Sequence, residues 1–290
     1  MFPQVIFRQR PGVTFGLAAG LMLAAGCSQA ETTDTPQVVK ALEAQGLTIV
    51  QEFDVSGDLR GFAGVAGEQP IAVYVTSDGK AIVGTRLDAQ GQPVDAGTLL
   101  DLVAKPMSEK TWAQLEAATW VLDGDADAPR VVYTFSDANC PYCHRFWEAA
   151  RPWVDSGKVQ LRHLFVGVIK ADSPAKAAAI LEAPDPSAAL LENEKNFAQG
   201  GITPAKGVSN RVQKILDENQ MLMQVNGFRG TPGIIVQQSD GLISKFNGMP
   251  QAGQLVEVLG PREYPVEWQS LYDLWVISIL EMLDEHESSQ

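Results

Sequence analysis

The hydrophobic pattern after residue 35 predicts a helix followed by several strands. Apolar residues of Val38–Ala44 recur at helical intervals, and Leu47–Val55 shows the partial period-two alternation of a half-buried strand. Two further β-rich runs, Ile71–Val75 and Ala81–Leu87, flank a turn that contains Asp78–Gly79. Because Asp-Gly favours the positive φ of a tight turn, these two runs predict a β-hairpin. Together the segments indicate a small α+β domain.

A helical linker is expected to follow this first domain, which covers about residues 36–100. The segments Leu99–Ala104 and Ser108–Val121 both have helical spacing, and Pro106 separates them. We therefore expect a linker helix within residues 101–128, ending in a polar stretch rich in Asp and Ala.

A second domain is predicted over residues 129–260. It opens with Val131–Phe135, a continuous β-branched and aromatic run typical of a buried strand. Near its end, Gly233–Val236 and Leu242–Phe246 are two further strand candidates separated by an Asp-Gly turn. The chain thus divides into two α+β units joined by helix.

Residues 1–30 have the pattern of a secretory signal. Arg8 and Arg10 precede an apolar run that is shorter than the ~20 residues a membrane-spanning helix needs. Two cleavage sites fit this segment. One resembles a bacterial lipobox that ends at Cys27, which would then carry a lipid, and the other is a small-x-small site after Ala30. Either site leads to export, with membrane attachment through Cys27 only in the first case.

Composition and charge narrow the function. The chain has 290 residues, of which 45% are hydrophobic, so it has enough apolar surface for real cores. Its net charge of -13 gives no general attraction to phosphate backbones, and we expect no nucleic-acid partner. Three cysteines are too few for a disulfide scaffold. With Cys27 lipidated or removed, the mature protein keeps Cys140 and Cys143.

The cysteine pair lies where a strand turns into a helix. Val131–Phe135 leads into Cys140-Pro141-Tyr142-Cys143, and proline is favoured as the first residue of a helix. Cys140 is therefore predicted at a helix N-terminus, where free N–H groups and the helix dipole stabilise a thiolate. Cys143 follows one turn later and can attack a mixed disulfide formed on Cys140. The spacing indicates a redox pair.

The motif is also compatible with zinc binding and with haem attachment. Zinc would need two further ligands, and the nearby candidates are His144 and His163 only. The residues Cys140–His144 also spell C-x-x-C-H, the c-type haem attachment pattern, for which Met221, Met223 or Met249 could supply an axial ligand. The strand before the motif and the proline within it favour a redox helix, so no metal site is predicted.

A distant proline supports the redox hypothesis. Thr231-Pro232 directly precedes the strand candidate Gly233–Val236. In the thioredoxin arrangement, a cis-proline loop packs against the redox cysteines. We therefore expect a cis peptide bond before Pro232 and contact between this loop and Cys140.

At this level of detail the sequence resembles the DsbC/DsbG family of dimeric periplasmic thiol:disulfide interchange proteins. The resemblance covers roughly residues 36–260 and is carried by segments around the cysteine pair and in the first domain. These segments are Val131–Trp147, Ala150–Leu161, Val166–Lys170, Thr231-Pro232 and the hairpin Tyr74–Gly91. The family's DsbC branch has a second disulfide in its thioredoxin domain, for which this chain lacks the cysteines, so the DsbG branch fits better.

The resemblance implies an α+β fold with three parts. An N-terminal cystatin-like domain forms the homodimer, a linker helix follows, and a C-terminal thioredoxin-like domain carries the cysteines. This last domain contains a helical insertion, here expected at about residues 172–227, with helices at Ala175–Leu181 and Val208–Val225.

The resemblance also implies the activity and its residues. Cys140 is the nucleophile and Cys143 the resolving thiol of a periplasmic disulfide isomerase or a reductase of oxidised single cysteines. Pro141, Tyr142, Thr231 and Pro232 are expected to bind substrate, and His144 to tune the pKa of Cys140. The reversible Cys140–Cys143 disulfide replaces any external cofactor, the substrates are proteins, and the membrane reductase DsbD supplies electrons.

Three alternative functions stay open at the level of sequence, one of them the c-type haem protein described above. A DsbA-like oxidase would be monomeric, and a dimeric chaperone or holdase would bind unfolded chains without using its thiols. Residues 261–290 lie beyond the resemblance. They combine helical spacing of aromatic residues with seven acids and one arginine, which predicts an extra acidic amphipathic helix.

Overall fold

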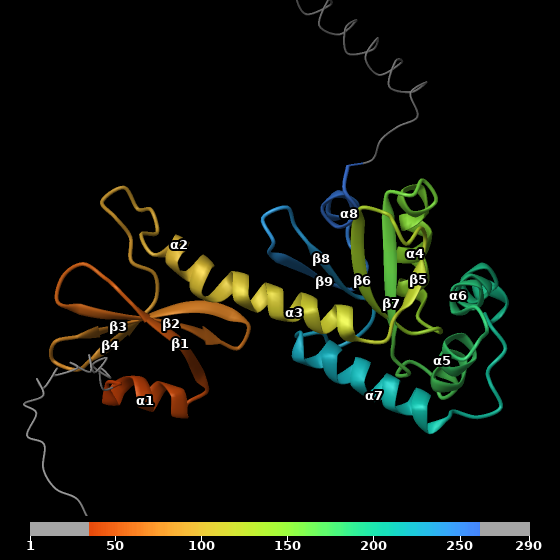
Figure 1. The fold of residues 1–290 in the computed structure, drawn as a ribbon, viewed down its shortest axis with the longest axis horizontal. Helices are drawn as coiled ribbons and strands as arrows, with labels where there is room; N and C mark the ends of the chain where they lie inside the picture. Colours follow the sequence, from red (N-terminus) through yellow and green to blue (C-terminus); the bar gives the residue numbers. More distant parts are fainter. Residues whose placement is uncertain (1–34, 262–290) are drawn as a thin grey trace, which may run out of the picture. The chain divides into compact units, whose positions relative to one another are not determined.

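The computed structural model describes residues 35–261 and shows an α+β fold (Figure 1). The predicted signal segment, the lipidation site at Cys27 and the acidic helix predicted for the C-terminal tail lie outside these residues. Within the part that the structure describes, no helix combines the length and the apolar character needed to cross a membrane.

The first domain is a four-stranded antiparallel sheet with one helix. Strands follow one another in the order β1-β2-β3-β4, so each strand pairs with its neighbour in sequence. The elements are α1 (Gln37–Ala44), β1 (Leu47–Phe53), β2 (Leu59–Ala66), β3 (Gln69–Thr76) and β4 (Ala81–Val83). The predicted helix, first strand and hairpin match α1, β1 and β3-β4, but the sequence analysis did not identify β2.

The hairpin forms for the reason that its turn residues suggest. Gly79 has a φ of 79°, which a residue with a side chain rarely adopts, and β3 pairs with β4 from Val75 opposite Ala81 to Val73 opposite Val83. The second strand of the hairpin ends at Val83, four residues earlier than predicted. β4 is consequently a short strand at the edge of the sheet.

Both faces of this sheet are covered. One face packs under α1, where Val39 lies against Phe62 and Val73, and all three are buried. The other face buries Tyr74 against Val103 of the segment that follows the domain. Successive side chains along β2 and β3 point to opposite faces of the sheet and therefore contribute to two separate apolar clusters.

The linker is one continuous helical run with a change of winding. It consists of α2 (Ala96–Leu99), a π-helical segment at Leu100–Ala104 and α3 (Lys105–Ala117). Pro106 lies in the first turn of α3 and does not break the run, because that turn follows a π-helical segment with a different hydrogen-bond pattern.

The predicted end of this helix is wrong. The helical pattern of the sequence continues to Val121, but α3 ends at Ala117, and Val121–Asp123 forms the strand β5. β5 pairs antiparallel with β7, with Val121 opposite His163. A strand partner about 40 residues away in the sequence overrides the local helical pattern.

The second domain is built on a five-stranded sheet in the order β5-β7-β6-β8-β9. β6 and β7 are parallel, whereas β5, β8 and β9 each run antiparallel to their neighbour. Besides β5, the strands are β6 (Arg130–Ser136), β7 (Val159–Phe165), β8 (Gly233–Gln237) and β9 (Ile243–Asn247). The three strands predicted in this domain match β6, β8 and β9.

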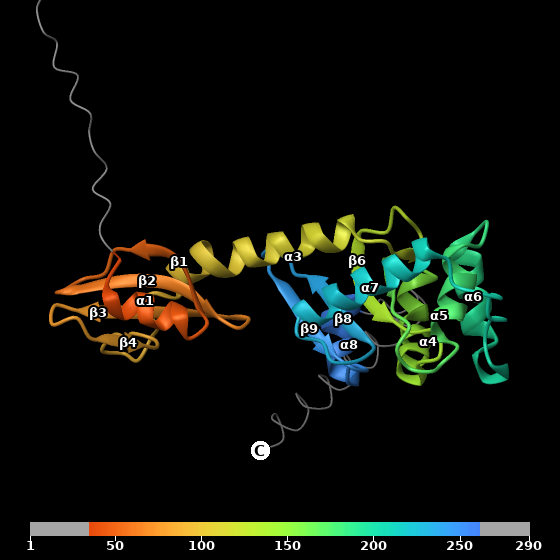
Figure 2. The same cartoon turned by 90° about the horizontal axis from the view of Figure 1, so that it is seen from below.

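Helices cover both faces of this sheet. One face packs against α4 (Pro141–Val154) and α8 (Ala252–Leu259), and Figure 2 shows α3 on the opposite side. Alternate residues of β6 separate the two layers, since Val132 faces α4 while Tyr133 and Phe135 contribute to the other cluster.

The predicted helical insertion contains one more helix than expected. The structure has α5 (Ser173–Leu181), α6 (Pro186–Lys195), a 3-10 turn at Phe197–Gln199 and α7 (Asn210–Val225). α6 begins where the Asp185 side chain accepts a hydrogen bond from the N–H of Ala188, an N-cap that the sequence analysis did not use. These helices share a buried apolar cluster of their own.

Candidate active site

Cys140 caps the N-terminus of α4, as the position of Pro141 predicts. Its sulfur accepts a hydrogen bond from the backbone N–H of Cys143, at 3.2 Å between the two atoms. Cys140 and Cys143 are buried thiols that lie at the point where β6 ends and α4 begins. The strand, the turn and the proline together fix one sulfur at the helix N-terminus and the other one turn inside it.

The Thr231-Pro232 loop lies against Cys140. The peptide bond before Pro232 is cis, and the Cys140 sulfur lies 3.4 Å from the carbonyl oxygen of Thr231. On the far side of the loop, the N–H of Gly248 donates to the Pro232 carbonyl at 2.8 Å. The structure thus brings Thr231 and Pro232 together with the cysteine pair across 91 residues of sequence.

The site stabilises Cys140 as a thiolate. Its pKa is lowered to about 6, chiefly by a hydrogen bond from the Cys143 thiol, which outweighs the opposing effect of burial. The polar Thr231 residue and the backbone N–H groups of Cys143 and Tyr142 add smaller contributions in the same direction. At neutral pH most Cys140 side chains are therefore ionised.

The second cysteine behaves in the opposite way. Burial raises the pKa of the Cys143 thiol well above its usual value, and the neighbouring Cys140 thiolate raises it further. Cys143 therefore keeps its proton while Cys140 carries the negative charge. The two sulfurs are chemically different, because Cys140 is a nucleophilic thiolate and Cys143 is a protonated thiol.

Pro141 and Tyr142 lie on the surface beside the buried cysteines. The Tyr142 ring is 53% exposed, and the Arg145 guanidinium lies 5.4 Å from the ring centroid. Both residues lie between the two cysteines in the first turn of α4 and are open to solvent.

His144 is bound to the helical insertion. Its Nδ1 lies 2.8 Å from a carboxylate oxygen of Glu194, and its ring stacks on Phe197 with the centroids 4.3 Å apart. Glu148, one turn further along α4, lies 3.5 Å from Nε2. Glu194 and Phe197 were not predicted, because nothing in their local sequence connects them with the cysteine motif.

The side chains considered for metal or haem ligation are dispersed. His163 lies 3.1 Å from the Ser136 hydroxyl in the core, Met223 is buried in the cluster under the sheet, and Met221 is exposed on α7. Across residues 35–261, no group of three or more His, Cys, Asp or Glu side chains is arranged to hold a metal ion.

A buried carboxylate beside the motif was also missed. Asp137 follows β6 directly and accepts hydrogen bonds from four donors, two of them in the loop after β7. Lys176, also buried, donates to the side chain of Asn139, the residue before Cys140. The pattern Asp137-Ala138-Asn139 after a strand is the one local signal for this network, because Asp and Asn side chains commonly bind nearby backbone groups.

Taken together, the fold and the cysteine pair define a thioredoxin-like thiol:disulfide oxidoreductase. Residues 124–261 match a family model described as a thioredoxin-like domain. Among solved structures, the chain is similar to the catalytic domain of Proteus mirabilis ScsC at 20% identity and a TM-score of 0.45, a match that covers 53% of this chain and 96% of that one.

The chain belongs to the DsbG family of thiol:disulfide interchange proteins. It is 42% identical to the DsbG protein of Pseudomonas aeruginosa over 251 residues, which cover 86% of this chain and 97% of the relative. It is 38% identical to DsbG of Escherichia coli over 241 residues, covering 83% and 97% of the two chains. These relatives span both of the domains described above.

Proposed function

We propose that Cys140 is the nucleophile and Cys143 the resolving thiol of a periplasmic disulfide isomerase or reductase. The observation that carries this proposal is the asymmetry of the pair, a Cys140 thiolate at the helix N-terminus with a protonated Cys143 behind it. Pro141, Tyr142, Thr231 and Pro232 form the surface against which the substrate lies.

The chemistry proceeds by thiol:disulfide exchange. The Cys140 thiolate attacks one sulfur of a substrate disulfide, forms a mixed disulfide and releases the other substrate sulfur as a thiolate. A different thiol of the substrate then attacks the substrate sulfur of the mixed disulfide, which forms a new substrate disulfide, releases the Cys140 thiolate and completes isomerisation. Alternatively, Cys143 gives up its proton and attacks Cys140, which releases the reduced substrate and leaves the Cys140–Cys143 disulfide.

Oxidised single cysteines fit the same mechanism. Attack of Cys140 on the sulfur of a sulfenic acid forms the mixed disulfide and expels hydroxide, which takes up a proton to become water. Because Cys140 has a low pKa, it is also a good leaving group when a substrate thiol attacks the substrate sulfur of the mixed disulfide. The reduced form is the active one, so the cycle needs an electron donor. We assign that role to a membrane reductase of the DsbD type.

A redox titration of the mature protein against glutathione tests this function. One reversible two-electron couple confined to Cys140 and Cys143 is expected, with Cys140 trapped in the glutathione mixed disulfide when the thiols are alkylated and analysed by mass spectrometry. The absence of such a couple would refute the proposal. Export through the predicted signal places this chemistry in the periplasm, and a lipid on Cys27 stays a prediction of the sequence.

The pH dependence of the reaction follows from the low pKa of Cys140. Below about pH 6 the thiol is protonated and unreactive, so the attack rate is expected to rise through about pH 6 and to level off above it. An ordinary thiol would continue to gain rate until about pH 8.5. Iodoacetamide labelling of the reduced protein across this range measures the midpoint.

The variant Cys143→Ala provides the control for this prediction. It removes the hydrogen bond that contributes most to the low pKa, so the midpoint for Cys140 labelling is expected to move upward. A midpoint near pH 8.5 in the parent protein would contradict the proposed stabilisation of the thiolate.

A homodimer formed through the first domain is supported by the edge strand β4. Its outer edge pairs with no strand of the described residues, and its Ile82 and Val83 side chains are 56% and 50% exposed. Leu87 and Val94, in the loop that follows, are exposed as well. An apolar edge strand with free backbone groups is a ready site for pairing with a second copy.

Charge at this edge is expected to dissociate the dimer. In Ile82→Lys, burial of an ammonium group would oppose association and raise the dissociation constant about thirtyfold, measured by analytical ultracentrifugation. Val50→Lys is the matched control, because Val50 is a similarly exposed residue of β1, the strand at the opposite edge. Equal effects of the two variants, or a monomeric parent protein, would contradict this interface, and a monomer would favour the oxidase alternative.

A further inference from the structure

One buried carboxylate organises the surface beside Cys140. Asp137 is 2% exposed, and its Oδ1 accepts hydrogen bonds from the N–H of Asn139 at 2.9 Å and the hydroxyl of Ser173 at 2.7 Å. Its Oδ2 accepts from the N–H groups of Val168 and Ile169 at 2.7 and 3.0 Å. Burying a charged carboxylate costs free energy unless all of its oxygens accept hydrogen bonds. The four hydrogen bonds therefore fix the carboxylate and its four donor groups relative to one another.

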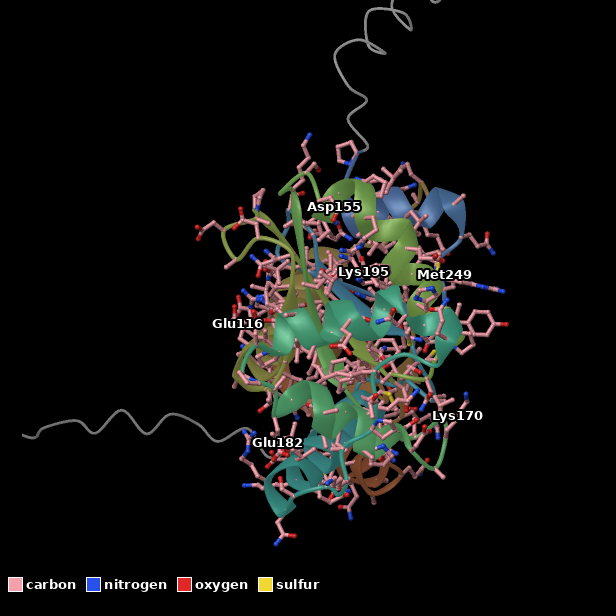
Figure 3. All side chains as sticks on the ribbon, turned by 90° about the vertical axis from the view of Figure 1, so that its right-hand side faces the viewer. Glu116, Asp155, Lys170, Glu182, Lys195 and Met249 are labelled. Carbon is pink, nitrogen blue, oxygen red and sulfur yellow. The ribbon has the colours of Figure 1, made fainter. Side chains whose placement is uncertain are left out.

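The loop that Asp137 holds is close to the cysteine. Asp137 accepts a backbone hydrogen bond from Cys140 at 2.9 Å, so the loop at Gly167–Lys170 is joined to the Cys140 backbone through a single residue. The loop follows β7, whose C-terminal end lies beside that of the parallel strand β6. Figure 3 shows Lys170, the last residue of the loop, on the same edge of the domain as Met249. Met249 directly follows Gly248, whose N–H donates a hydrogen bond to the Pro232 carbonyl.

The other side of the loop is also fixed. A Cβ atom on Gly167 would come within 2.9 Å of the Pro174 side chain and 3.1 Å of its backbone, so α5 packs directly on the loop backbone. The N–H of Lys170 donates to the Ser173 hydroxyl at 3.0 Å, and the N–H of Ser173 donates back to the Lys170 carbonyl at 3.0 Å. The loop backbone is therefore held from two directions.

This rigid backbone presents apolar side chains to the solvent. Val168 is 42% exposed and Ile169 is 44% exposed, although both residues are β-branched hydrophobics whose neighbours in β7 are buried. Tyr142, beside Cys140 in sequence, is also exposed. An apolar surface held in place by a buried charge and adjoining a reactive thiol has the character of a binding site.

We propose that Val168 and Ile169 form a docking site for an apolar side chain of an extended polypeptide substrate, next to the cysteine that reacts with Cys140. Asp137 is the positioning residue of this site. The inference rests on the proposed exchange reaction at Cys140, because a substrate whose sulfur reaches that cysteine must also cross the surface beside it. Unfolded or misoxidised proteins expose apolar residues near their cysteines, and these residues would be buried against the loop.

The test compares two synthetic peptides that react as disulfide-linked homodimers. One has valine and leucine beside its cysteine, and the other has serine and glutamine. In the double variant Val168→Ser/Ile169→Ser, the ratio of the second-order rate constants for the apolar and polar peptides is expected to fall about tenfold from its value in the parent protein. The matched control is Met221→Ser/Val225→Ser on α7, where two exposed apolar residues lie far from the cysteines in sequence, and there the ratio should stay unchanged.

Two further variants test the positioning role of Asp137. Asp137→Asn leaves one acceptor oxygen for four donors, and Gly167→Ala pushes the loop away from Pro174, so both variants are expected to lower the same ratio. A lower melting temperature of Asp137→Asn without a change in the ratio would show that Asp137 is structural only and would overturn its role.

Two further outcomes would overturn the docking site. One is a ratio within twofold of the parent value in the Val168→Ser/Ile169→Ser variant. The other is loss of the dimer in that variant by analytical ultracentrifugation, which would mean that a second copy of the chain covers the loop. Failure of the parent protein to react with glutathione disulfide would instead refute the exchange reaction, so the two proposals fail in different ways.

Discussion

Replacement of Cys140 by serine is expected to reduce the rate of disulfide exchange about a thousandfold or more. A serine hydroxyl stays protonated at any pH at which the protein is folded and cannot form a disulfide, although it fills nearly the same volume at the N-cap of α4. The measurement is the reduction of a peptide disulfide by the full-length mature protein, with dithiothreitol as electron donor. Folding of the variant is checked by its thermal unfolding.

Cys143→Ser is the matched variant for this experiment. It leaves the attacking thiolate in place and removes the thiol that resolves the intermediate, so the mixed disulfide with the substrate should accumulate on Cys140. Peptide mapping by mass spectrometry identifies the linked cysteine. Turnover of Cys140→Ser at the parent rate, or a substrate linked to Cys143 in the parent protein, would refute the assignment of roles.

The second large effect concerns stability and arises at a buried ionic cluster next to β7. Asp123 accepts hydrogen bonds from both terminal nitrogens of Arg151, and Nε2 of His163 lies 3.6 Å from the same carboxylate. Burial raises the pKa of the Asp123 carboxyl, but the nearby His163 and the hydrogen bonds from Arg151 outweigh it, so the net shift is downward. Through these three side chains, the cluster joins β5 to α4 and to β7.

Asp123→Ala is expected to lower the free energy of unfolding by about 3 kcal/mol, because it leaves a largely buried guanidinium without its acceptor and removes the carboxylate that faces the buried His163 imidazole. Urea denaturation at neutral pH measures the difference. Asp155→Ala is the matched control, since Asp155 also lies 3.5 Å from Arg151 but its side chain is 68% exposed, and this variant should lose about 0 to 1 kcal/mol. The prediction fails when the two variants lose the same stability.

Acid adds a second readout for the same cluster. A carboxyl whose pKa is lower in the folded than in the unfolded protein stabilises the fold above its unfolded value of about 3.9. That stabilisation disappears as pH falls through the folded pKa of Asp123. The stability difference between the parent protein and Asp123→Ala should therefore shrink below about pH 4 and persist at neutral pH.

Much of the active-site segment could be predicted because its determinants are local. The run Val131–Phe135, the proline after Cys140 and the spacing of the two cysteines all lie within 13 residues, and together they identify β6, the start of α4 and the capping sulfur. The β3-β4 hairpin was equally accessible, because its Asp-Gly turn is a property of four residues.

Elements whose determinants lie elsewhere in the chain were missed or misplaced. β2 contains two glycines, a composition that argues against a strand, but a Cβ on Gly64 would lie 2.7 Å from the Thr48 carbonyl of the neighbouring strand. The absence of a side chain there permits close approach of two backbones, which a single segment cannot reveal. Val121–Asp123 likewise became a strand because β7 offers it hydrogen-bond partners.

The chemistry of the site likewise has determinants that are local in sequence and others that are distant. Residues near the motif were sufficient to propose Cys140 as the attacking sulfur, since helix N-termini stabilise thiolates whatever surrounds them. The extent to which its pKa falls depends on the hydrogen bond from the Cys143 thiol and on Thr231, which is 91 residues away. The Asp137 network is likewise formed by groups distant in sequence, which converge where β6 and β7 end side by side. Burial and hydrogen-bond geometry are properties of the packed chain, and for this reason they appear only when the domain is assembled.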